Sequence, residues 1–403
     1  MKNIKELDED IIDLSKECIS FDLENIPKQD IQFYMGIQFI YVNSGQKRFY
    51  EVARKYSTEE ILPEEIREII LPAALLVKQS PAKQNEIFAH LHEEIRTSPK
   101  DNTVLLPVSG IIVERPFQIG EFTLFSKDSY IKSNAKLSQT DIKSINSTFP
   151  QTVAVAHFRS HPKSAKEIGI KKLKTELNRL KAFIPYLSIT SKHWIQPLKT
   201  DTSFSDCFFV YGDYGVHEGI SYLTELFPLN IDEKAPPPSI SFREFLENRM
   251  HFQSIVAGNT KFWKALKMGY EWLGKQYDEE RLQNKLIYSI FALECLLSNS
   301  TNFSSITAAV AEKCAFLIGN TKEERLKIFF KAKKLYDIRS ALAHGSSESD
   351  ISEEDTWQAL GLALAVYRKV TEMLVNNIIS SQEDLDSFVL GEKFDISPPA
   401  RDK

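Results

Sequence analysis

The chain has 403 residues, of which 42% are hydrophobic and 26% are charged, so it can form two or three globular domains, and its composition excludes a disordered protein. Its formal net charge of −5 excludes a general attraction to nucleic acid, so any contact with RNA must come from a local basic patch. No run approaches 18 apolar residues, and residues 1–14 alternate charged with apolar side chains, unlike a signal peptide. We therefore expect a cytoplasmic protein that does not contact the membrane.

Residues 1–100 are predicted to be mainly helical. Periodic apolar residues predict helices over 4–19 and 63–77, the second preceded by Ser57 and Glu60 at the spacing of a capping box. Residues 32–42 are compatible with a strand. His90 and His92 lie two residues apart in a predicted helix and therefore point to different faces, which argues against a shared metal ion.

From residue 102 the pattern changes to that of paired strands. Residues 102–125, 152–158 and 206–215 are rich in β-branched and aromatic side chains, and a helix is predicted over 164–183, which indicates an α+β domain over 101–232. Gly212, Gly215 and Gly219 match no dinucleotide-binding or P-loop spacing and favour a hairpin turn. Because no His, Cys or Gly grouping here has the spacing of a known site, we predict that residues 1–232 sense a signal or bind a partner and carry no active site.

The consecutive prolines Pro236 to Pro238 are predicted to end this region, because they form a stiff spacer that cannot enter a helix. An all-helical domain is expected over 239–380, followed by a tail over 381–403 of which part packs. Periodicity and capping residues predict helices over 242–256, 260–277, 280–298, 305–318, 322–343 and 353–378. The expected fold is thus an α+β N-terminal region followed by an all-α bundle.

The helix over 322–343 has the clearest boundaries. Thr321 and Glu324 form a capping box at its start, and Gly345 is a natural stop. Apolar residues at heptad spacing on two of its sides predict a helix that is covered on more than one side, as in the centre of a bundle. Between residues 322 and 339 there are seven basic and three acidic residues, and the basic ones include a stripe that forms either an RNA-binding or a solvated face: Lys327, Lys331 and Lys334.

Arg339 and His344 form the candidate catalytic pair. Five residues apart on a regular helix, they would lie about 140° apart, so they can meet only where the helix loosens before Gly345. Histidine can accept and donate protons near neutrality, and the guanidinium of arginine offers two parallel donors to phosphate oxygens, which suits RNA cleavage without a metal. Spacing alone favours a structural interpretation, in which Arg339 pairs with Glu294 or Asp337 and His344 interacts with the helix dipole.

The sequence LYDIRSALAHG at 335–345, with FALECLLSNS at 291–300 and AVAEKCAFLIG at 309–319, resembles the HEPN superfamily, in particular its Apea-like branch in bacterial defence proteins. The family signature is an Arg, four to six residues and a His, which Arg339 and His344 match, and the Glu of the family's preceding helix is matched by Glu294. The resemblance covers residues 240–380. One departure is Ser340, where many toxin-type members carry Asn, Asp or His.

This resemblance implies a metal-independent endoribonuclease that acts as a toxin-like effector in antiphage defence, with RNA as substrate and no cofactor. In the family two motifs meet across a two-fold interface, so a homodimer through the C-terminal helical domain is implied. We expect Glu294, Asp337 and Ser340 to orient the pair, a role that the family arrangement supports for Glu294. Attack by the 2′-hydroxyl would leave a 2′,3′-cyclic phosphate, and a protein partner or phage-derived trigger would act on the N-terminal region. The alternative is a non-catalytic HEPN module that dimerises or binds RNA for a partner protein.

Overall fold

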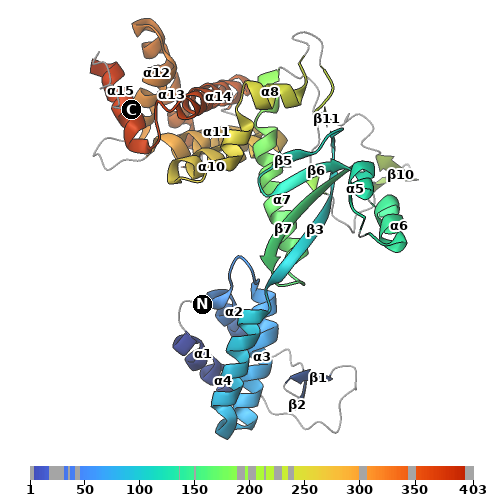
Figure 1. Cartoon of the computed structure of the whole chain (residues 1–403). Helices are drawn as coiled ribbons and strands as arrows, with labels where there is room; N and C mark the ends of the chain where they lie inside the picture. Colours follow the sequence, from blue (N-terminus) through green and yellow to red (C-terminus); the bar gives the residue numbers. More distant parts are fainter. Residues whose placement is uncertain are drawn as a thin grey trace. The chain divides into compact units, whose positions relative to one another are not determined.

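The computed structural model describes residues 4–17, 31–34, 37–40, 46–135, 137–148, 151–187, 196–197, 206–212, 215–221, 229–234, 240–298, 306–343 and 351–394 (Figure 1). The chain divides into two compact units. The first consists of Met1–Leu105 and Ala156–Lys171, and the second consists of Leu106–Val155 and Lys172–Lys403. Both units therefore contain segments that are distant in the sequence.

The first unit is built around helix α3 (Pro63–Gln79), which packs against α1 (Ile4–Glu17), α2 (Gln46–Tyr56) and α4 (Gln84–Thr97). The predicted helices are present, and residues predicted as a strand form the antiparallel hairpin of β1 (Ile31–Tyr34) and β2 (Ile37–Ile40). The predicted cap of α3 is wrong. Pro63 stands in the first turn and Leu62 provides no side-chain cap, whereas the Thr58 hydroxyl accepts hydrogen bonds from the backbone amides of Glu60 and Ile61.

A five-stranded sheet has the order β5-β6-β7-β3-β8, and the registers given for its pairs β5–β6, β6–β7 and β3–β8 are antiparallel. Its strands are β3 (Lys100–Ser109), β5 (Phe117–Ile119), β6 (Phe122–Ser126), β7 (Thr152–Ser160) and β8 (Gln196–Pro197). The short strands β4 (Ile111–Ile112) and β11 (Leu229–Asn230) pair in parallel. The predicted glycine hairpin is confirmed, because β9 (Asp206–Gly212) pairs antiparallel with β10 (Gly215–Ser221). Helices α5 (Lys127–Ser133), α6 (Gln139–Thr148) and α7 (Ala165–Lys181) and the 3₁₀ turn η4 (Ile184–Leu187) complete this α+β part.

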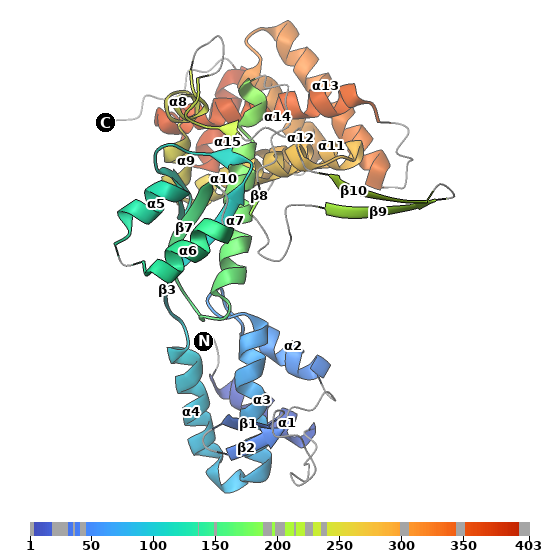
Figure 2. The same ribbon diagram turned by 90° about the vertical axis from the view of Figure 1, so that its right-hand side faces the viewer.

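The C-terminal part is all helical, as predicted, and its helices gather into one bundle (Figure 2). They are α8 (Phe242–Asn248), α9 (Phe252–Ala257), α10 (Lys261–Asp278), α11 (Leu282–Leu297), α12 (Ile306–Ile318), α13 (Lys322–Ala343), α14 (Glu353–Val375) and α15 (Gln382–Phe394). The single helix predicted over 242–256 is divided, because His251 takes a left-handed backbone conformation with φ 50°. Helix α15 lies in the predicted tail and starts at a reciprocal cap of Ser381 and Asp384. None of the described helices combines the length and the apolar character needed to cross a membrane.

Helix α13 begins at Lys322 behind the predicted Thr321–Glu324 capping box, but it is not central in the bundle. Of its described side chains only Ala332, Leu335 and Tyr336 are buried, and Phe330 is 62% exposed. The described residues of both predicted apolar stripes are buried or half-buried, and α13 packs against α12, α11 and α14, so only the predicted central position is wrong. The central positions belong to α11 and α14, which pack against each other and bury long apolar runs.

The α+β part and the helical bundle share one packed interface through α7 and α10. Phe183 stacks on Tyr270 with ring centroids 4.7 Å apart, and the buried ammonium of Lys181 pairs with Asp278. This contact explains why the second unit contains both the sheet and the bundle, whereas the sequence predicted separate domains on either side of residues 236–238. Those prolines lie outside the described residues.

Gly274 is expected to be irreplaceable in this interface. A Cβ at Gly274 would lie 1.6 Å from the backbone oxygen of Asn178, so Gly274→Ala must push α7 and α10 apart and should cost about 1–3 kcal/mol or more. Gly361 is a matched control, because a Cβ there meets nothing within 4 Å, and Gly361→Ala should stabilise its helix by about 0.5–1 kcal/mol. Urea denaturation measures both changes, and a loss of stability for both variants would contradict this packing.

A buried ion pair fixes the start of α8 to the sheet region. Arg243 donates from Nε to Oδ1 of Asp232 at 2.6 Å and from Nη2 to Oδ2 at 3.1 Å, and it also donates to the carbonyl oxygens of Arg115 and Pro116. The two charged side chains are 6% and 4% exposed. Burial alone would raise the pKa of Asp232, but hydrogen bonds from Arg243 and from the Glu114 amide lower this pKa to about 2. Asp232 therefore stays ionised inside the fold.

Candidate functional site

Helices α11 and α13 bring Arg339 and Glu294 together. On α13 the buried residues Leu335 and Tyr336 lie one turn before Arg339, so Arg339 lies on the side of α13 that packs into the bundle. On α11 the buried pair Ala292 and Leu293 precedes Glu294, which emerges at the edge of the contact. Nη2 of Arg339 lies 3.8 Å from Oε1 of Glu294. This distance gives an ion pair but is too long for a hydrogen bond.

Aromatic side chains adjoin this pair. The guanidinium of Arg339 lies 6.0 Å from the ring centroid of Phe291, which stands one turn before Glu294 on α11. Phe291 meets Trp272 of α10 edge to face at 5.3 Å, and Tyr288 stacks on Trp272 at 5.4 Å. All three rings are half-buried. Arg339 therefore lies at the end of a partly exposed aromatic surface formed by α10 and α11, which we call the aromatic surface (Trp272, Tyr288, Phe291).

The electrostatics of the pair differ from those of a surface salt bridge. Burial raises the pKa of Glu294, and the opposing effect of the Arg339 charge does not cancel this increase. Both side chains are half-buried, with 24% of Glu294 and 37% of Arg339 exposed. A carboxylate with a raised pKa beside a guanidinium is typical of functional sites, although structural ion pairs can share it.

Tyr336 is a third member of this cluster that the sequence did not single out. Its side chain is 4% exposed, and its hydroxyl has no hydrogen-bond partner among the residues that the structure describes. Burial, and then the negative charge of Glu294, raise the pKa of Tyr336, so its phenol remains protonated. Its position three residues before Arg339 was the signal that could have identified it, because residues at this spacing share a helix face.

Two of the other residues predicted to complete the site, Asp337 and Ser340, do not contact Arg339 or Glu294 through a hydrogen bond or ion pair in the described part of the chain. His344 lies outside the described residues, so its meeting with Arg339 stays a prediction. Asp337 and Ser340 are exposed, and on a regular helix they lie about 160° and 100° around the axis from Arg339. Neither makes a hydrogen bond or ion pair with Glu294 or Arg339 in the described part of the chain, so the structure does not support their predicted positioning role.

The predicted lysine stripe is divided. Lys327 and Lys331 are exposed, whereas Lys334 donates to Oδ1 of Asp355 on α14 at 2.8 Å. This hydrogen bond raises the pKa of Lys334 and lowers the pKa of Asp355, so the contact stabilises both charges. The stripe lies about 80° to 140° around α13 from Arg339. Lys334 therefore joins α13 to α14, and Lys327 and Lys331 are exposed to solvent.

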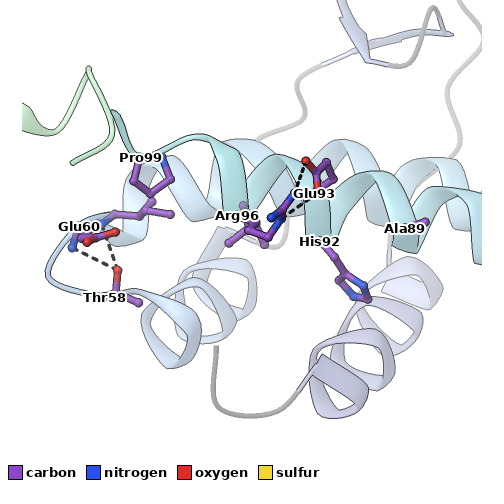
Figure 3. A pocket seen from close by; sticks show the side chains of 9 residues that line it. Thr58, Glu60, Ala89, His92, Glu93, Arg96 and Pro99 are labelled. Carbon is purple, nitrogen blue, oxygen red and sulfur yellow. Dashed lines mark hydrogen bonds and ion pairs between the residues drawn. The ribbon is translucent and has the colours of Figure 1, made fainter. Parts of the chain in front are cut away.

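A separate pocket lies in the first unit between α4 and the segment before α3. It has a volume of about 400 Å³, and Figure 3 shows Arg96 turned to Glu93 and His92 pointing away from both. His92 pairs with Asp8 of α1 at 2.7 Å, and Arg96 makes two hydrogen bonds to the Glu93 carboxylate. Its lining residues are Thr58, Glu60, Ile61, Ala89, His92, Glu93, Ile95, Arg96 and Pro99. The charged groups of this pocket are thus already paired, either with each other or with residues outside it, instead of converging on a ligand.

Among the described residues no group of three or more His, Cys, Asp or Glu side chains is arranged to hold a metal ion. Comparisons of the chain with family models, with curated proteins and with solved structures give no match, so a function must be argued from the residues described above.

Proposed function

We propose that the chain is a metal-independent endoribonuclease of the HEPN type that acts as a toxin-like effector in bacterial antiphage defence. The observation that carries the proposal is the Arg339–Glu294 ion pair between α13 and α11. The resemblance to the HEPN family singles out Arg339 and Glu294, which are 45 positions apart and lie on separate helices. In the structure these two side chains form an ion pair. His344 follows the last residue of α13, Ala343, at the end of the helix that carries Arg339.

In the proposed reaction the 2′-hydroxyl of a ribose attacks the adjacent phosphorus and the bond from phosphorus to the 5′-oxygen breaks. One His344 accepts the proton of the attacking hydroxyl, and the second His344 of a dimer donates a proton to the leaving oxygen. Arg339 donates hydrogen bonds to the phosphate oxygens and stabilises the negative charge of the crowded intermediate. The products are a 2′,3′-cyclic phosphate and a free 5′-hydroxyl.

Glu294 holds Arg339 in the resting protein in this proposal. A phosphate group must compete with the Glu294 carboxylate for the guanidinium, and the 3.8 Å separation makes this competition feasible. The ionised Glu294 also orients the guanidinium toward the edge of the helix pair before RNA binds. The aromatic surface next to Arg339 is half-buried in one copy and could be covered further by a second copy.

The homodimer predicted from the sequence must use the face of α13 that carries Arg339. Phe330 is the most exposed apolar residue of α13, but it lies about 180° around the axis from Arg339. A contact across Phe330 would keep the two Arg339 side chains apart. Tyr288 lies on the aromatic surface beside Arg339, so it belongs to the face that a composite site requires.

We expect Tyr288→Glu to break the dimer and to abolish RNA cleavage, because it places a charge in a two-fold interface where each substitution occurs twice. Phe330→Glu is the matched control and should leave both dimer and cleavage intact. Light scattering at micromolar concentration gives the mass, and circular dichroism shows that both variants fold. A wild-type monomer that still cleaves RNA would contradict the composite site.

The test of the function is the chemistry of the RNA ends after induced expression and with the purified protein in the presence of a chelator. The proposal requires 2′,3′-cyclic phosphate ends that depend on Arg339. The alternative function is a non-catalytic HEPN module that dimerises or binds RNA for a partner protein, in which the pairing of Arg339 with Glu294 is a structural contact. That module would leave RNA uncut while still binding it.

A further inference from the structure

We infer that Tyr336 is a positioning residue of the Arg339 site, whose hydroxyl donates to the Glu294 carboxylate when an RNA phosphate draws Arg339 away. This inference rests on the proposed function, because it takes RNA as the ligand of Arg339. It assigns Tyr336 a role in binding that neither the sequence motif nor the resting ion pair requires. Tyr336 does not touch the reacting atoms.

The first argument is the state of the Tyr336 hydroxyl. The side chain is 4% exposed, and the hydroxyl has no hydrogen-bond partner in the described part of the chain. Buried polar groups are nearly always hydrogen-bonded, and an unpaired one has a cost in free energy. Tyr270 and Tyr367, which are also fully buried, each have a partner for their hydroxyl, Thr371 and the carbonyl oxygen of Ala292. The hydroxyl of Tyr336 is therefore a hydrogen-bond donor that has no acceptor in the described part of the chain.

The second argument is where this donor lies. Tyr336 and Arg339 are three residues apart on α13, and the side chain of a helical residue covers the turn before its own Cα, so the Arg339 side chain lies over Tyr336. Glu294 pairs with Arg339 from α11 and is close enough to influence the phenol. Burial raises the pKa of the phenol, so it keeps its proton at neutral pH and can donate to a carboxylate.

The third argument is the weakness of the resting contact. The Arg339–Glu294 distance of 3.8 Å allows no hydrogen bond, so Arg339 breaks no hydrogen bond to Glu294 when it moves to a phosphate. Its departure would leave Glu294 as a half-buried charge without a cation, which is unfavourable. A hydrogen bond from the Tyr336 hydroxyl to the Glu294 carboxylate would offset this cost. Between the resting state and the RNA-bound state, Glu294 would exchange Arg339 for Tyr336, and Arg339 would exchange Glu294 for a phosphate.

The first measurement is the affinity of Tyr336→Phe for a 2′-O-methyl oligonucleotide, which lacks the hydroxyl needed for cleavage. We expect its Kd to rise about tenfold, the typical effect of losing a hydrogen bond to a charged group. Its melting temperature should stay the same or increase, because no hydrogen bond is lost at rest. Tyr270→Phe is the matched control, since it loses its bond to Thr371 and should melt at a lower temperature while binding normally.

The second measurement repeats Tyr336→Phe in a Glu294→Gln background. Glu294→Gln alone should bind more tightly than the parent, because Arg339 is released, and the effect of Tyr336→Phe should then shrink to about twofold or less. Equal weakening in both backgrounds, or parental binding by Tyr336→Phe, would overturn the role of Tyr336. If the parent binds no RNA through Arg339, the proposed function fails and this inference fails with it. If the parent binds through Arg339 and only Tyr336→Phe has no effect, the proposed function stands.

Discussion

Replacing His344 with alanine should lower RNA cleavage by about 10² to 10⁴-fold and remove the growth defect caused by overproduction, because His344 would supply the proton transfers of the reaction. Arg339→Lys should also fail. An ammonium retains the charge but cannot reproduce the two parallel hydrogen bonds of a guanidinium to phosphate oxygens. Both rates are measured on the same RNA with purified protein, and growth is measured after induction.

The controls for this prediction separate lost chemistry from lost structure. Both variants should fold and dimerise like the parent, as measured by circular dichroism and light scattering. His90→Ala removes an exposed histidine from α4 of the first unit and should leave cleavage unchanged. Full toxicity and cleavage by a normally folded His344→Ala would refute the catalytic assignment and favour the non-catalytic module.

Arg243→Ala should destabilise the fold by about 3–5 kcal/mol, because it leaves the buried Asp232 carboxylate without its main cationic partner. Arg115→Ala is the matched control, since Arg115 contacts the same carboxylate at 3.4 Å but is 72% exposed. Its removal should cost less than about 1 kcal/mol. Urea denaturation measures both losses, and similar values for the two variants would show that Arg243 does not fix α8 to the sheet region.

The same ion pair predicts how stability depends on pH. The pKa of Asp232 is lowered from 3.8 to about 2, so its contribution is complete above pH 4 and is lost as the pH falls toward 2. This lowered pKa means that the ionised Asp232 contributes about 2 kcal/mol to the free energy of unfolding at neutral pH. Stability curves of the parent between pH 5 and pH 2 should therefore be steeper than those of Arg243→Ala, in which this carboxylate has lost its main partner.

Local sequence signals predicted the helices well and failed where the backbone depends on distant contacts. The capping box at Thr321 gave the start of α13, because a cap involves only residues three positions apart. The break at His251 was missed, since nothing in the sequence near it forbids a continuous helix. The central position expected for α13 was also wrong, because apolar periodicity shows which faces can be buried but not whether neighbouring helices surround the whole helix.

The sequence by itself determined the change from an α+β region to an all-α region and the position of Arg339 near the end of a capped helix. Capping, periodicity and β-branched composition act over a few residues, so they can be read without a structure. Only the tertiary structure decided that Glu294 rather than Asp337 pairs with Arg339, that Lys334 is held by Asp355, and that the Tyr336 hydroxyl is buried without a partner. These facts depend on how α11, α13 and α14 cross. Such crossings are fixed by the packing of whole helix faces and not by any short segment.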